Sequence, residues 1–61
     1  MSKQMIKTRA EYAKRVGQQI GNDGVIEYAN EVIAMCDNRK MSPEAIIKTT
    51  AYSIVLRVYY R

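Results

Sequence analysis

The chain of 61 residues contains no histidine and only one cysteine, Cys36. An intramolecular disulfide needs two cysteines, and structural zinc sites are usually built from cysteine together with histidine. The sequence therefore excludes a disulfide framework, and it predicts no metal site and no cofactor. A lone cysteine without such a framework is typical of a reducing compartment, so we expect a cytoplasmic protein.

The sequence also lacks any long apolar run. Lys48 and Arg57 interrupt the apolar C-terminal part, which leaves no segment long enough to span a membrane. The first residues, M-S-K-Q-M-I-K, have no apolar stretch typical of a signal peptide. We expect a soluble protein that does not bind a membrane.

Groups that commonly carry catalysis are scarce. Cys36 falls on the apolar face of a predicted helix, where a structural thiol is expected and not a nucleophile. Glu27 and Glu31 are read as a solvated or salt-bridged helix face and not as an acid/base pair. The segment G-N-D-G at 21–24 lacks the lysine and the preceding strand of a phosphate-binding loop. We predict no catalytic residue, no small-molecule substrate and no enzymatic activity.

The charges that are present follow a basic, acidic, basic order. Residues 1–20 carry a net charge of +4, residues 21–38 carry −4 and residues 39–61 carry +4. Segments of opposite charge can neutralise one another within one bundle or across a dimer. The overall charge of +4 therefore does not by itself indicate a nucleic-acid partner.

The spacing of apolar residues predicts an all-α protein. We expect a small three-helix bundle over about 9–20, 24–37 and 43–60, forming a single helical domain with a short basic N-terminal arm over about 1–7. The glycines of the 21–24 segment mark the first turn. Ser42 and Pro43 mark the start of the third helix, as cap and first helical residue.

The first predicted helix raises a question about Arg9. Thr8 and Glu11 fit a capping box that would start the helix at about residue 9. If the helix instead reached back to residue 2, Arg9 would lie in the middle of the apolar face and would need a partner there. In either case Ala13 and Gly17 contribute to a face of small residues against which another helix can pack closely.

The predicted helix 43–60 is apolar over most of its circumference. Its polar residues occupy a narrow arc, with Ile46 beside them: Thr50, Ser53, Arg57 and Arg61. Such a helix must be buried on more than one side, and a chain this short has little core with which to bury it. We therefore predict a homodimer formed through this helix. The β-branched and aromatic stretch 52–60 also suits a strand paired with a second molecule.

Tyrosine and arginine, which are over-represented at interface hot spots, gather near the C-terminus. The candidate partner-binding residues are Arg57, Tyr59, Tyr60 and Arg61. Arg9 and Arg15 beside Tyr12 form a second candidate surface. We predict a small regulatory or inhibitory protein that binds a protein partner. Small basic chains of this kind are common among regulators of phages and mobile elements, although no motif here indicates that origin.

A nucleic-acid-binding regulator is the alternative. Its contacts would come from the basic surface of the first helix and from the turn before the third helix: Lys7, Lys14, Arg15, Arg39 and Lys40. Neither alignment of a helix-turn-helix pattern with the first two helices places apolar residues at all the required positions. The middle helix is also acidic and would repel phosphate. A solvated basic face, or one that pairs with the acidic helix, is the competing interpretation.

Overall fold

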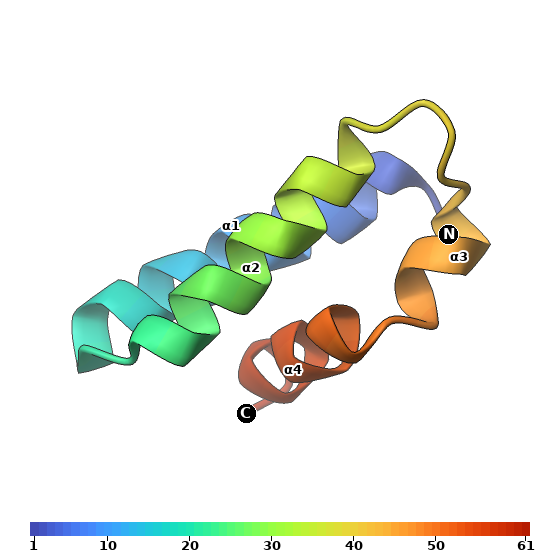
Figure 1. The fold of residues 1–61 in the computed structure, drawn as a ribbon. Helices are drawn as coiled ribbons and strands as arrows, with labels where there is room; N and C mark the ends of the chain where they lie inside the picture. The colour runs from blue at the N-terminus through green and yellow to red at the C-terminus, as the bar shows by residue number, and fades with distance from the viewer.

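A computed structural model describes all of residues 1–61 and contains four helices and no strand (Figure 1). The helices are α1 (Lys3–Ile20), α2 (Asp23–Cys36), α3 (Pro43–Ile47) and α4 (Thr50–Tyr59). The prediction of an all-α protein is confirmed. The alternative of a strand over 52–60 is wrong, because this stretch lies almost entirely in α4.

Helix α1 begins at Lys3, six residues before the predicted start. The Ser2 side chain caps it by accepting the Met5 N–H at 3.2 Å. Thr8 is not a cap, because it lies inside the helix and its hydroxyl donates to the Gln4 carbonyl at 2.9 Å. The predicted arm over about 1–7 is therefore helical from residue 3 onward. The reason is burial: the earlier start places Ile6 in the core, where it is 0% exposed.

Helices α1 and α2 lie side by side and are joined by a tight turn (Figure 1). Gly21 ends α1 in the left-handed conformation with φ 67°, which glycine adopts without strain. Asn22 then caps α2 by accepting the Val25 N–H at 3.2 Å. The helices approach closely at Gly17, where a Cβ atom would lie 3.0 Å from side-chain atoms of both Val25 and Ile26. The predicted small-residue seam is thus the contact between α1 and α2.

The third predicted helix is divided in two at Lys48 and Thr49. Thr49 caps α4 by accepting the Tyr52 N–H at 3.2 Å, and its hydroxyl donates to the Ile46 carbonyl at 2.7 Å. Because of this break, the axis of α3 is not collinear with the axis of α4. Ile46, predicted to lie beside the polar arc, is consequently buried, while Ile47 is 40% exposed.

The core lies where α1, α2, α3 and α4 meet. Its side chains are mostly small, and the buried apolar residues are Ile6, Ala10, Ala13, Ala29, Val32, Ile46, Ala51, Tyr52 and Val55. The predicted polar arc of α4 is exposed throughout, while Ile54, Leu56 and Val58 are half-buried. Most apolar residues of α4 are therefore at least partly covered within one chain. None of the four helices has the length and apolar character needed to cross a bilayer.

Candidate protein-binding surface

Arg9 lies where α1 faces α4, and it does meet a partner there. Its Nη1 atom donates to the Tyr52 hydroxyl at 3.0 Å. Its guanidinium carbon lies 5.2 Å from the ring centre of Tyr59 and 5.7 Å from that of Tyr60, within the range of cation–π attraction. The hydrogen bond to Tyr52 raises the pKa of Arg9 above its ordinary value, so the group stays charged at every physiological pH.

Three tyrosines continue outward from Arg9. The rings of Tyr12 and Tyr59 meet edge to face, with centres 5.5 Å apart and planes at 81°. The rings of Tyr59 and Tyr60 also meet edge to face, with centres 5.1 Å apart and planes at 85°. These are the favoured arrangements of aromatic pairs, yet Tyr12 is still 44% exposed and Tyr60 67% exposed. The cluster is thus ordered by its own contacts while remaining open to solvent.

Met5 extends this cluster one helical turn before Arg9, and its side chain is 49% exposed. We call the set Met5, Arg9, Tyr12, Tyr59 and Tyr60 the aromatic surface. A shallow hollow of about 170 Å³ opens within it, lined by Gln4, Met5, Thr8, Arg9 and Tyr59. The surface therefore combines large apolar groups with one permanent positive charge.

The aromatic surface joins the two surfaces that the sequence indicated separately. Tyr59 and Tyr60 belong to the candidate partner-binding residues at the C-terminus. Arg9 and Tyr12 belong to the second candidate surface, on the first helix. Arg57 and Arg61 are exposed but make no ring or ion-pair contact, and the same holds for Arg15. Met5 was not predicted as part of a binding surface. The possible extension of the first helix back to residue 2 could have indicated it, because that extension places Met5 on the same helix as Arg9.

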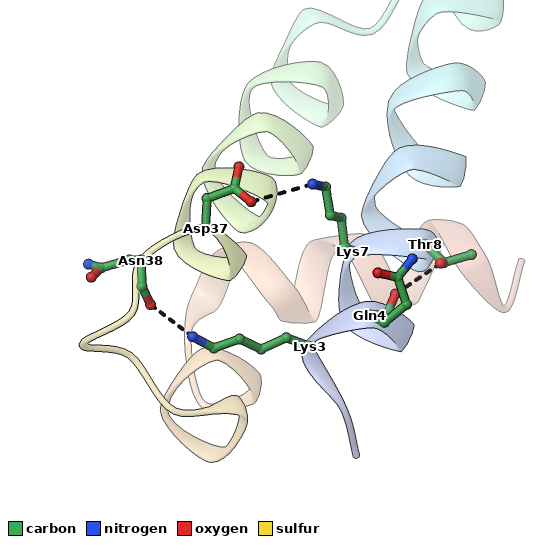
Figure 2. A network of polar contacts seen from close by, with 6 residues as sticks. All are labelled: Lys3, Gln4, Lys7, Thr8, Asp37 and Asn38. Carbon is green, nitrogen blue, oxygen red and sulfur yellow. Dashed lines mark hydrogen bonds and ion pairs between the residues drawn. The ribbon is translucent and has the colours of Figure 1, made fainter.

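The basic residues proposed to contact nucleic acid fall into two groups along α1. Lys7 pairs with Asp37 at 3.4 Å, and the Lys3 ammonium donates to the Asn38 carbonyl at 2.8 Å (Figure 2). These contacts hold the turn that contains Arg39 and Lys40 against the start of α1. Lys14 and Arg15 lie about 10 Å further along α1, as the rise per residue of a helix requires.

The acidic face of α2 remains largely unpaired. Lys7–Asp37 is the only ion pair in the structure, so the expected neutralisation between acidic and basic segments occurs once. Glu31 instead borders a groove of about 660 Å³ between α2 and the start of α4. The groove is lined by Tyr28, Glu31, Ala34, Met35, Thr49, Thr50 and Ala51. The groove lies between α2 and α4, whereas the aromatic surface lies between α1 and α4, and the two share no residue.

Cys36 lies half-buried at the end of α2, against the core. Burial raises the pKa of its thiol, and the neighbouring Asp37 carboxylate raises it further. Since an ordinary cysteine has a pKa of about 8.5, this thiol is protonated at neutral pH. A protonated thiol is a poor nucleophile.

The chain matches no protein-family model, no curated protein and no solved structure. A function can therefore be inferred only from its own residues and their arrangement.

Proposed function

We propose that this chain is a small regulatory or inhibitory protein that binds another protein through the aromatic surface, without catalysing a reaction. The observation that supports this most is the gathering of exposed Met5, Tyr12, Tyr59 and Tyr60 around Arg9. Methionine, tyrosine and arginine are enriched at the centres of protein interfaces. A contiguous exposed patch of such residues is typical of an interaction site.

The internal contacts of the aromatic surface would favour tight binding. A side chain that is already ordered loses less conformational entropy when a partner covers it. The Tyr52 hydroxyl and the neighbouring rings position Arg9 before any partner arrives. Regulation would then be steric, because the bound protein covers or displaces a surface of its target. We place this activity in the cytoplasm, where a lone thiol such as Cys36 stays reduced.

Quantitative affinity capture tests this function. We expect the wild-type chain to retain a specific protein, and the variant Tyr12→Ala/Tyr60→Ala to lose it. Ile20→Ala is the matched control, because Ile20 is similarly exposed at 52% but lies at the end of α1, outside both the aromatic surface and the groove. Circular dichroism should show that all three proteins are folded. Equal retention by both variants, or no specific protein retained by the wild type, would contradict the proposal.

We further propose that the chain forms a homodimer through α4. The groove between α2 and α4 carries the unpaired Glu31, and the exposed Arg57 lies near the other end of α4. A twofold axis that pairs two antiparallel α4 helices would place Arg57 of each copy over Thr50 and Glu31 of the other.

Sedimentation over a wide concentration range tests the dimer. The wild type should reach twice the chain mass, and Glu31→Lys or Arg57→Glu alone should weaken association. Combining the two changes restores opposite charges and should restore the dimer. A monomer at every concentration would contradict this proposal, as would single variants that associate like the wild type.

Nucleic-acid binding is a second candidate, favoured by one contact. The Lys3–Asn38 hydrogen bond brings Arg39 and Lys40 to the start of α1 and concentrates positive charge there. Binding through phosphate contacts should weaken steeply as salt rises. Arg39→Gln/Lys40→Gln should then reduce the binding of DNA or RNA more than Lys14→Gln/Arg15→Gln. Absence of binding at low salt would exclude this candidate.

A further inference from the structure

The Arg9 guanidinium is a charge without a counter-ion. Its Nη1 atom donates to the Tyr52 hydroxyl and also approaches the Met1 sulfur at 3.7 Å, and both of these acceptors are neutral. No carboxylate pairs with it, since Lys7–Asp37 is the only ion pair. A guanidinium carries five N–H donors, so Arg9 has donors left for a ligand.

The hollow beside Arg9 offers space for such a ligand. Its volume of about 170 Å³ exceeds several-fold the roughly 30 Å³ that one water molecule occupies in the liquid. Met5 and the Tyr59 ring form apolar walls, while Gln4 and Thr8 contribute polar atoms. Arg9 is the only charged residue that lines it. The hollow therefore suits a small group with an apolar stem and a single negative charge.

We propose that this hollow receives the side-chain carboxylate of an aspartate or glutamate from the partner protein. The inference rests on the proposed function and specifies the chemistry by which the aromatic surface recognises that partner. Carboxylate and guanidinium form short charge-assisted hydrogen bonds, often two in parallel. The methylene groups of the acidic residue contact Met5 and Tyr59. A phosphate dianion fits less well, because only one positive charge faces the hollow.

A self-blocking variant tests the carboxylate. Met5 precedes Arg9 by four residues, so the two side chains are neighbours on one face of α1. Met5→Glu places a carboxylate of the chain's own in the hollow, and Met5→Gln places a neutral side chain of the same shape there. We expect Met5→Glu to weaken partner binding at least tenfold relative to Met5→Gln. Equal binding by the two variants overturns the inference and leaves the proposed function intact, whereas a wild type that retains no protein overturns the proposed function itself.

The same variant gives a readout that needs no partner. In Met5→Glu, the introduced carboxylate should titrate below the ordinary glutamate pKa of about 4.3, because Arg9 stabilises its charged form. Its methylene protons should show nuclear Overhauser contacts to the Tyr59 ring. A carboxylate that titrates at its ordinary pKa and shows no contact to Tyr59 means that the hollow does not accept this group, which overturns the inference.

Discussion

Helix α1 packs against α2 and against α4 in two different ways. Against α2 it presents a seam of small residues, and at Gly17 even one added Cβ atom would lie 3.0 Å from the side chains of the other helix. Against α4 the contact is centred on a large buried side chain. Tyr52 is 1% exposed, and its hydroxyl accepts a hydrogen bond from Arg9 and donates one to the Met1 sulfur.

Opposite kinds of substitution should therefore disrupt the two contacts. The seam is sensitive to added atoms, because closely packed helices cannot yield without moving the backbone. The α4 contact is sensitive to lost atoms, because the surrounding structure only partly closes the cavity that a deleted core side chain leaves. Changes at Tyr52, Gly17 and Thr49 should break these contacts with successively smaller effects on stability.

Removal of the ring of Tyr52 should have the largest effect. Tyr52→Ala leaves a cavity in the core, and such changes cost about 3–5 kcal/mol in the free energy of unfolding. A domain of this length has a total stability of about 3–9 kcal/mol. We expect Tyr52→Ala to unfold the chain or lower its melting temperature strongly, as measured by circular dichroism. Tyr52→Phe keeps the ring and loses only the hydroxyl, so its loss should be much smaller. Similar melting of all three proteins would mean that the ring does not hold α4.

Enlargement of Gly17 should have the next largest effect. Gly17→Val adds atoms against Val25 and Ile26, and overpacking of this kind costs about 1–3 kcal/mol. Gly24→Val is the matched control, because a Cβ atom at Gly24 meets only the Asn22 side-chain oxygen, at 3.4 Å. Urea unfolding should show Gly17→Val to be less stable than Gly24→Val. The opposite order would mean that the seam can widen freely.

Loss of the α4 cap should have a smaller effect. Thr49→Ala removes the acceptor for the Tyr52 N–H, and loss of a helix cap costs about 1 kcal/mol. Thr49→Ser keeps a hydroxyl that can accept this N–H, so it should lose much less stability. Thermal unfolding distinguishes the two variants. If Thr49→Ala is no less stable than Thr49→Ser, the cap does not determine where α3 and α4 divide.

The smallest effect concerns the pH dependence of Cys36, at the end of α2 farthest from the turn at Gly21. Because burial raises the pKa of its thiol, the folded chain binds this proton more tightly than the unfolded chain does. The resulting stability is fully present below the unfolded pKa of about 8.5, and it is lost as the pH rises through the folded value. At pH 8 we expect iodoacetamide to alkylate the native thiol more slowly than the thiol in urea. Equal rates would show that the end of α2 is open to solvent.

Much of the fold could be predicted from local pattern. The glycines after α1, the Ser42-Pro43 start and the small-residue face were all found, because each depends on backbone preference or on residue spacing along one helix. The start of α1 was not found, since Ser2 and Thr8 are both acceptable caps and only the burial of Ile6 distinguishes them. The division at Thr49 was missed for a similar reason, because it depends on Ile46 reaching the core.

The candidate site could likewise be predicted only in part from the sequence. Tyr59 and Tyr60 could be selected from composition, since tyrosine near arginine is typical of interfaces. Their contact with Arg9 and Tyr12 could not be predicted from composition. The two pairs of residues lie about fifty residues apart in the chain, and only the packing of α4 on α1 brings them together.

The sequence by itself determined that this protein is helical, where its first two turns fall, that it holds one unpaired thiol, and that Arg9 needs a partner if α1 begins early. Those properties follow from local propensity, spacing and residue count. Only the tertiary structure decided which residue meets Arg9, which isoleucine of α3 is buried and which tyrosines share a surface. Such contacts join residues that are distant in the chain, and side-chain packing selects them from several arrangements that local preference allows equally.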